Sequence, residues 1–183
     1  GFAVAAAAAR RGADTVLVAG PVALPTPAGV ERIDVRSAAQ MHAAVVAALP
    51  GDVFVAAAAV ADFRPSAIAA HKIKKRPGED GLELRLVRTR DIVADVAAHA
   101  RRPRLVVAFA AETSDLAAHA LGKLRDKRVD LVAANHVGRA GIGFESEDNA
   151  LTLYWHHGEE ALPRAPKTQL AERLLDRVRA LLP

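Results

Sequence analysis

Two short segments combine residue types that could hold a polyanion. Residues 58–64 are an apolar stretch that ends in Asp62 and Phe63 followed by an arginine. Residues 72–75, Lys-Ile-Lys-Lys, form a basic cluster just before the turn at residues 76–78, Arg-Pro-Gly. A buried strand that ends in polar groups beside a cationic loop is suited to several negative charges. Together the two segments predict a nucleotide enzyme.

Two further lysines strengthen this prediction. Lys123 and Lys127 lie four residues apart in a predicted helix, so both ammonium groups share one face. A solvated basic edge would also explain such a pair. The number of lysines favours a phosphate site, because a triphosphate carries about four negative charges that lysines and a divalent cation together neutralise.

Two residues at predicted strand ends each allow more than one role. Asp62 could bind a metal ion or a ribose hydroxyl, or it could cap the following segment, and its position alone slightly favours capping. Phe109 could stack on a base, although an apolar ring at a strand end is more often part of the core.

Composition limits the class of protein. With 183 residues one domain is expected, and it is long enough to bury a core. The net charge of +4 fits nucleic acid, phosphorylated small molecules or simply solvated arginine faces. The chain contains no cysteine, and no apolar run is long enough to cross a bilayer. The first residues also lack a basic segment followed by an apolar core. We expect a soluble, cytoplasmic protein.

Several other sites are disfavoured. The histidines do not form an H-x-x-x-H pair, which argues against a catalytic zinc site. Gly141 and Gly143 follow no strand-to-helix turn of the dinucleotide type, so NAD binding is not supported. Aromatic residues make up only 4% of the chain, which argues against stacking on nucleic-acid bases.

Strands and helices are expected to alternate along the chain. Hydrophobic periodicity and helix-capping residues predict helices over 2–11, 37–49, 91–99, 114–127 and 168–182. Short apolar or alternating runs predict strands over 15–19, 30–35, 53–60, 82–86, 105–110, 129–134 and 151–155. The strand at 82–86 is expected to pair with the Lys72 segment across a turn at 79–81. The predicted fold is one doubly wound, Rossmann-like α/β domain with a mostly parallel sheet and an inserted β-hairpin or flap at about 70–88.

Ligands of such sheets bind outside the carboxyl ends of the strands. We therefore expect the residues after three strands to converge on one crevice: Asp62 and Phe63, then Phe109, Glu112 and Thr113, then Asn135 and His136.

The motifs resemble one family over nearly the whole chain. The chain is similar to the phosphopantothenate–cysteine ligase domain of the bacterial bifunctional coenzyme A biosynthesis protein, in which a flavin-dependent decarboxylase usually precedes this domain. The matching segments, in order, are 1–13, 20–27, 58–62, 72–75, 91–93, 109–113 and 144–151.

The resemblance implies a two-step ligation. In the family, 4′-phosphopantothenate reacts with CTP to give an acyl-cytidylate and pyrophosphate, and L-cysteine then displaces CMP. Lys72 corresponds to the residue tied to forming the acyl-cytidylate, and the segment from Lys74 to Gly81 to a mobile flap; its named members here are Lys74, Lys75, Arg76, Pro77 and Gly78. The CTP-binding positions fall on Ala58, Asp62, Phe63, Lys72, Arg90, Asp91, Ile92, Val93, Phe109, Lys123 and Lys127.

The resemblance also implies partners. Magnesium is expected with CTP, with Asp62 as a candidate ligand, and no flavin is expected in this domain. The family is dimeric, and the hairpin region is expected to contribute to pairing. No nucleic acid or membrane partner is expected.

The chain departs from the family pattern in two ways. Thr89 and Arg90 replace the usual asparagine and proline, and Arg90 could add a phosphate contact or lie in solvent. A first strand and a phosphate-cradling turn that precede Gly1 in the family are absent from this sequence. We therefore expect weak CTP binding and little ligation from these residues alone. The alternatives are a non-catalytic nucleotide-binding module of the same fold and a nucleic-acid-binding α/β domain.

Overall fold

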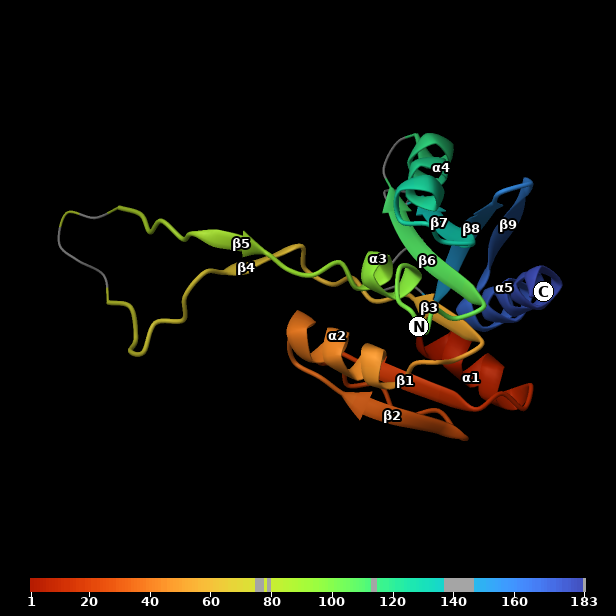
Figure 1. Cartoon of the computed structure of the whole chain (residues 1–183), viewed down its shortest axis with the longest axis horizontal. Helices are drawn as coiled ribbons and strands as arrows, with labels where there is room; N and C mark the ends of the chain where they lie inside the picture. Colours follow the sequence, from red (N-terminus) through yellow and green to blue (C-terminus); the bar gives the residue numbers. More distant parts are fainter. Residues whose placement is uncertain (75–77, 79, 113–114, 137–146, 183) are drawn as a thin grey trace.

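Helices and strands alternate along most of the chain (Figure 1). The structure is a computed structural model, and it describes residues 1–74, 78, 80–112, 115–136 and 147–182. Its helices are α1 (Phe2–Arg10), α2 (Ala38–Ala47), α3 (Ile92–Ala97), α4 (Leu116–Asp126) and α5 (Lys167–Leu181). Its strands are β1 (Thr15–Ala19), β2 (Val30–Asp34), β3 (Val53–Ala56), β4 (Phe63–Pro65), β5 (Leu86–Arg88), β6 (Leu105–Glu112), β7 (Leu131–His136), β8 (Asp148–Trp155) and β9 (Gly158–Pro166).

The central sheet has the strand order β3-β6-β7-β8-β9. β3, β6 and β7 are parallel, with Ala56 opposite Ala108 and Phe109 opposite Ala133, whereas β8 and β9 run antiparallel. β1 and β2 form a separate parallel pair. This is the mixed α/β fold with mostly parallel strands that the sequence predicts.

Side chains that alternate along β6 and β7 build two cores, one on each face of the sheet. Val106, Ala108 and Val132 pack with residues of α2, α3 and α4. Leu105, Val107 and Leu131 pack with residues of α1 and α5. Because both faces are covered, the central strands are apolar throughout, as is usual for parallel sheets. The fold is therefore doubly wound, as expected.

Local signals explain where several helices begin and end. The Gln40 amide donates to Ser37 Oγ at 3.2 Å, which caps α2 as predicted. The Ala94 amide donates to Asp91 Oδ1 at 3.1 Å, which caps α3. Gly12 follows α1 with φ = 84°, a left-handed conformation that glycine adopts without a Cβ penalty.

The inserted hairpin differs from the prediction. β5 pairs with β4, with Arg64 opposite Val87, and the described residues of the Lys72 segment, 72–74, form no strand. Leu82 and Leu84 are 63% and 60% exposed, so their alternation with polar residues does not create one buried face. Residues 61–74 and 80–90 instead form an arm that extends away from the rest of the molecule (Figure 1).

Two other strand predictions also need correction. β3 ends at Ala56 rather than at Val60, so the apolar stretch up to Asp62 leaves the sheet before the polar residues begin. β9 was not predicted, because its charged residues and its proline at position 163 are atypical of a strand. An edge strand tolerates proline, since one side of its backbone needs no partner, and β9 is such an edge.

Candidate active site

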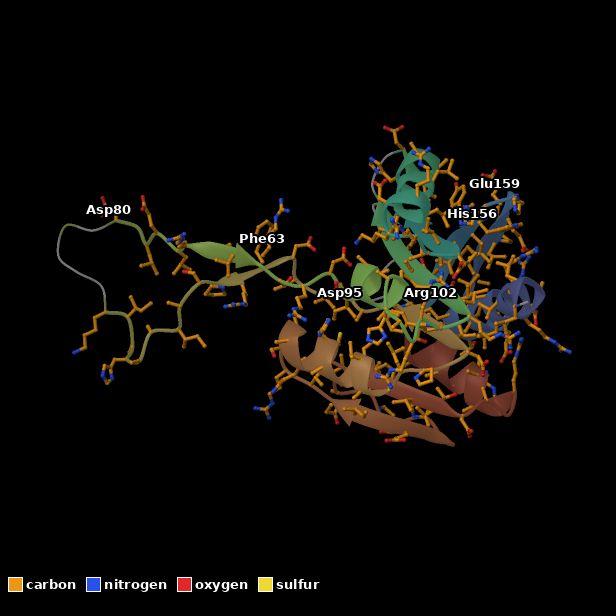
Figure 2. The ribbon with its side chains drawn as sticks, in the orientation of Figure 1. Phe63, Asp80, Asp95, Arg102, His156 and Glu159 are labelled. Atoms are coloured by element: carbon orange, nitrogen blue, oxygen red, sulfur yellow. The ribbon has the colours of Figure 1, made fainter. Side chains whose placement is uncertain are left out.

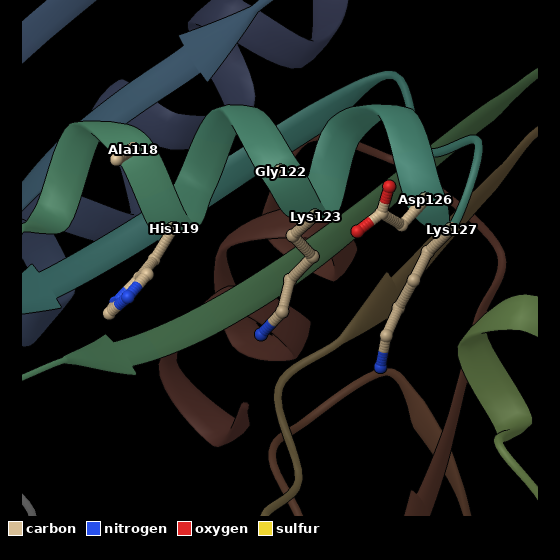
Figure 3. Close-up of a pocket in the computed structure, with 6 residues that line it drawn as sticks. All are labelled: Ala118, His119, Gly122, Lys123, Asp126 and Lys127. Atoms are coloured by element: carbon tan, nitrogen blue, oxygen red, sulfur yellow. The ribbon is translucent and has the colours of Figure 1, made fainter.

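The lysines of α4 line a hollow beside β6 (Figure 3). The hollow has a volume of about 400 Å³ and is lined by Ala118, His119, Gly122, Lys123, Asp126 and Lys127. Lys123 Nζ donates to the Phe109 carbonyl of β6 at 3.2 Å. Both lysine side chains project from the same side of the helix, as their spacing predicts.

Asp91 connects α4 with the start of α3. Lys127 Nζ lies 2.9 Å from Asp91 Oδ2, and the same carboxylate caps α3 through the Ala94 amide. Burial disfavours the charged form of Asp91, but the hydrogen bonds from Lys127 and Ala94 outweigh it and hold the pKa of this carboxyl below its ordinary value. Two predicted site residues, Asp91 and Lys127, are thus in direct contact.

The neighbours of Asp91 have different surroundings. Ile92 is only 7% exposed and Val93 packs against the same core, so any ligand contact from these two residues would come from the main chain. Arg90 is exposed. Of the predicted set 90–93, Asp91 and Arg90 are therefore the residues with side chains available to a ligand.

The base of the arm brings a second predicted group together. The Thr89 amide donates to the Asp62 carbonyl at 2.9 Å, and Thr89 Oγ1 donates to the Ala61 carbonyl at 2.6 Å. Asp62 and Phe63 thus lie beside the chain that leads to Arg90. Ala58, Asp62 and Phe63 are all exposed. The roles of these residues in ligand binding remain predictions.

The structure does not bring the Lys72 segment to the lysines of α4. Lys72, Lys74 and Gly78 are exposed, and the part of the arm beyond β4 and β5 lies away from the sheet (Figure 1). In Figure 2, Phe63 lies on β4 and Asp80 lies farther out along the arm. The flap residues Lys75, Arg76 and Pro77 fall outside the described residues.

Phe109 presents its carbonyl to Lys123, while its ring is half-buried against the core on the α1 and α5 face. This placement agrees with the core alternative for the ring, and the CTP contact remains a prediction. Asn135 is 8% exposed at the end of β7, and its Oδ1 has no hydrogen-bond partner among the described residues. Thr113 and the side chains of Glu112 and His136 lie outside the described part of the chain.

Sequence reasoning missed Arg32 on β2. Its side chain is 14% exposed, and its guanidinium donates to the carbonyls of Leu24 at 2.6 Å and Val22 at 3.4 Å. It also lies over the Phe2 ring, 5.3 Å from the centroid. Arg32 therefore ties the loop after β1 to the start of α1. Arg32 also pairs with Asp34 at 2.7 Å, two residues along the chain. The sequence gives no signal of its role in holding the loop, because the partners there are main-chain carbonyls.

The described residues contain no cluster of three or more His, Asp or Glu side chains that could hold a metal ion. Among the same residues, no helix is long and apolar enough to span a membrane.

Comparison with known proteins decides the family. The family described as DNA/pantothenate metabolism flavoprotein C-terminal domain matches residues 1–182. The chain belongs to this family. It is 50% identical over 176 residues to the coenzyme A biosynthesis bifunctional protein CoaBC of Vibrio cholerae, covering 96% of this chain and 44% of that protein. It is 47% identical over 180 residues to CoaBC of Escherichia coli K12, covering 97% of this chain and 44% of that protein. The chain thus spans less than half the length of these curated relatives.

Solved structures of other proteins have the same fold. A crystal structure of the C-terminal domain of CoaBC has a TM-score of 0.81 and 31% sequence identity, covering 100% of this chain and 81% of that one. A Cab2 mutant in complex with phosphopantothenate-cysteine has a TM-score of 0.63 at 17% identity, covering 83% of this chain and 52% of that one. The second similarity concerns the fold alone.

Proposed function

We propose that this chain catalyses the CTP-dependent ligation of 4′-phosphopantothenate with L-cysteine, a step of coenzyme A biosynthesis. The observation that carries the proposal is the hollow beside β6, which Lys123 and Lys127 line and where Lys127 is paired with Asp91, in a member of a pantothenate-metabolism family. The Cab2 structure supports the choice of product, because phosphopantothenate-cysteine is the molecule bound to that protein of similar fold.

The reaction proceeds in two displacements. A carboxylate oxygen of phosphopantothenate attacks the α-phosphorus of CTP, and the bond to the β-phosphate breaks to release pyrophosphate. The cysteine amine then attacks the acyl carbon, loses a proton and expels CMP. Negative charge builds on phosphate oxygens in the first step, and nearby ammonium groups stabilise it. Lys123 and Lys127 provide two such groups beside the central sheet, and Lys72 provides a third from the arm.

The residues present fit a magnesium ion that is held mainly by the nucleotide. Mg²⁺ commonly takes one or two carboxylates together with substrate phosphates and waters, so it does not require a cluster of protein ligands. Asp62 is exposed at the base of the arm and would supply a carboxylate. The ion would neutralise part of the triphosphate charge.

Ligand-induced stabilisation tests the nucleotide preference. We expect CTP with magnesium to raise the melting temperature more than ATP, GTP or NAD does, because binding to the native state alone adds stability. The shift should shrink most in Lys127→Ala, and less in Lys72→Gln, whose ammonium group comes from the arm. Equal shifts for all nucleotides would contradict the assignment.

Product formation separates the ligase from a non-catalytic module. In the full-length protein, phosphopantothenate, cysteine and CTP should yield phosphopantothenoylcysteine, CMP and pyrophosphate in equal amounts. CTP binding without this product would favour the non-catalytic alternative.

The relatives' name as bifunctional proteins supports a further proposal, that this domain functions together with a flavin-dependent decarboxylase domain and binds no flavin itself. Purified full-length protein without flavin absorbance would contradict it.

We also propose that two copies of the chain pair through the arm. Large apolar side chains are exposed along it, and they comprise Phe63, Ile68, Ile73, Leu82, Leu84 and Leu86. A monomer gains nothing from exposing so many apolar groups on one projection, whereas a second copy could cover them. The double variant Leu82→Glu/Leu84→Glu should therefore shift sedimentation from dimer to monomer. Leu121→Glu, at an exposed leucine of α4, is the matched control. A wild-type monomer, or a dimer that survives the arm variant, would overturn this proposal.

A further inference from the structure

His119 belongs to the same row of side chains as the two lysines of α4. Residues 119, 123 and 127 are spaced by four, so they follow one stripe of the helix. Figure 3 shows the imidazole projecting from the same side of α4 as the ammonium groups of Lys123 and Lys127. All three side chains line the hollow of about 400 Å³. The row is about 12 Å long at 1.5 Å per residue, so it could follow a polyphosphate chain.

The direction of α4 places His119 at the end of this row that is nearest to the carboxyl ends of the parallel strands. α4 follows β6 and returns across the sheet, so its first turns lie near the carboxyl ends of the parallel strands (Figure 1). His119 is therefore nearer to that edge than Lys123 or Lys127. Ligands of open α/β sheets bind at the carboxyl edge.

The two lysines are already engaged within the chain, and an acidic residue shares the hollow with them. Lys127 is paired with Asp91, Lys123 donates to the Phe109 carbonyl, and Asp126 also lines the hollow. A polyanion would bind here more tightly if a further hydrogen-bond donor contacted it together with these two cations. An imidazole N–H is such a donor in either protonation state. His119 also takes part in an interaction within the chain, so a phosphate would share or replace it.

We propose that His119 is a third anion-binding residue of this site, donating an imidazole N–H to a phosphate oxygen of the bound nucleotide. The inference rests on the proposed nucleotide site and adds a residue to it. It concerns binding: the imidazole would touch the ligand directly and complete a row of three donors along α4.

Calorimetric titration of the full-length protein tests the inference with two probes, CTP with magnesium and inorganic tripolyphosphate. His119→Ala should weaken binding of both probes about tenfold, the usual loss for a hydrogen bond to a charged group. His119→Gln, which retains an N–H donor, should recover most of the affinity. Arg125→Ala is the matched control, because it removes a cation from α4 at an exposed position outside the row. It should change the affinity less than twofold.

The outcomes separate this inference from the proposed function. Wild-type affinity in His119→Ala, or an equal loss in Arg125→Ala, would overturn the role of His119. Equal binding of CTP and tripolyphosphate by the wild type would contradict nucleotide selectivity, while the tripolyphosphate series would still test His119. If the wild type binds neither probe, both proposals are wrong. Because His119 is exposed, its variants should melt at the wild-type temperature, and this measurement excludes unfolding as the cause.

Discussion

The lysines of the proposed site come from two regions that are held in very different ways. Lys123 stands on α4 and Lys127 is the residue at its C-cap. The helix packs through Ala120 and Leu124 against one face of the sheet, and each ammonium group has a defined partner. Lys72 stands on the arm, where residues 61–74 and 80–86 are exposed throughout. The arm's only regular pairing among the described residues is the short ladder of β4 with β5.

This difference indicates separate roles for the two regions. Cations on a packed helix occupy fixed positions before a ligand arrives, so their attraction costs little reorganisation. A segment with few buried contacts opens and moves at low free-energy cost. The α4 lysines are therefore suited to recognise the triphosphate, whereas Lys72 is suited to a step that requires a group to arrive after binding.

The largest expected effect is on stability, and it separates core from arm. Leu124→Ala should lower the free energy of unfolding by about 3 kcal/mol, because it removes a fully buried side chain beneath the α4 lysines. Leu84→Ala on the arm should cost less than about 0.5 kcal/mol at protein concentrations low enough to favour the monomer. Urea unfolding of both variants measures the difference. Equal losses would show that the arm packs against the core in solution.

The second effect should separate binding from chemistry. Lys72→Gln should lower kcat about 100-fold, equivalent to about 2.7 kcal/mol, because it removes a cation that acts on the developing phosphate charge. Its melting temperature should not change, since Lys72 is exposed. Arg85→Gln, another exposed cation of the arm, is the control for a general loss of charge. If Arg85→Gln loses as much activity, the arm acts by net charge and Lys72 has no specific role.

A third variant tests whether exposure alone makes a segment mobile. In the loop after β1, Val22 and Leu24 are exposed, as the leucines of the arm are. The carbonyls of these two loop residues, however, accept hydrogen bonds from Arg32. Arg32→Ala should remove about 1–2 kcal/mol of stability and speed amide hydrogen exchange over residues 20–30. Arg36→Ala, at a nearby exposed arginine, should leave this exchange unchanged. Unaltered exchange in Arg32→Ala would mean that the loop is fixed by its prolines rather than by the guanidinium.

The same contrast between core and arm decides what the sequence could predict. Features set by local chemistry were predictable: the caps at Ser37 and Gly12, the shared face of Lys123 and Lys127, and the buried strand β6. The arm was not, because the alternation at Leu82 and Leu84 indicates a strand only where another part of the molecule buries one face. The contact between Asp91 and Lys127 and the anchoring by Arg32 join residues distant in sequence, and such contacts depend on tertiary packing.

The smallest expected effect concerns the link between the two regions. Asp91 follows the base of the arm, and its ion pair with Lys127 connects that base to α4. Asp91→Asn keeps a capping side chain and should lower the free energy of unfolding by only about 0.5 kcal/mol, because solvent screens a partly exposed ion pair. Asp91→Ala also loses the cap, so its cost should rise to about 1.5 kcal/mol.

The pH dependence of this small difference identifies its source. The folded pKa of Asp91 is lowered, so the contribution of the ion pair is present above the ordinary aspartate pKa of about 3.9 and is lost as the pH falls through the folded value. The difference in the free energy of unfolding between wild type and Asp91→Asn should therefore disappear in acid. The additional loss of stability in Asp91→Ala should decrease less, because a protonated carboxyl still offers an acceptor to the Ala94 amide. Urea unfolding at pH 7 and at the lowest pH that keeps all three proteins folded measures both differences. A loss of stability in Asp91→Asn that persists in acid would show that it comes from packing rather than from the ion pair. The base of the arm would then be held by the Thr89 hydrogen bonds and the main chain rather than by its charge contact with α4.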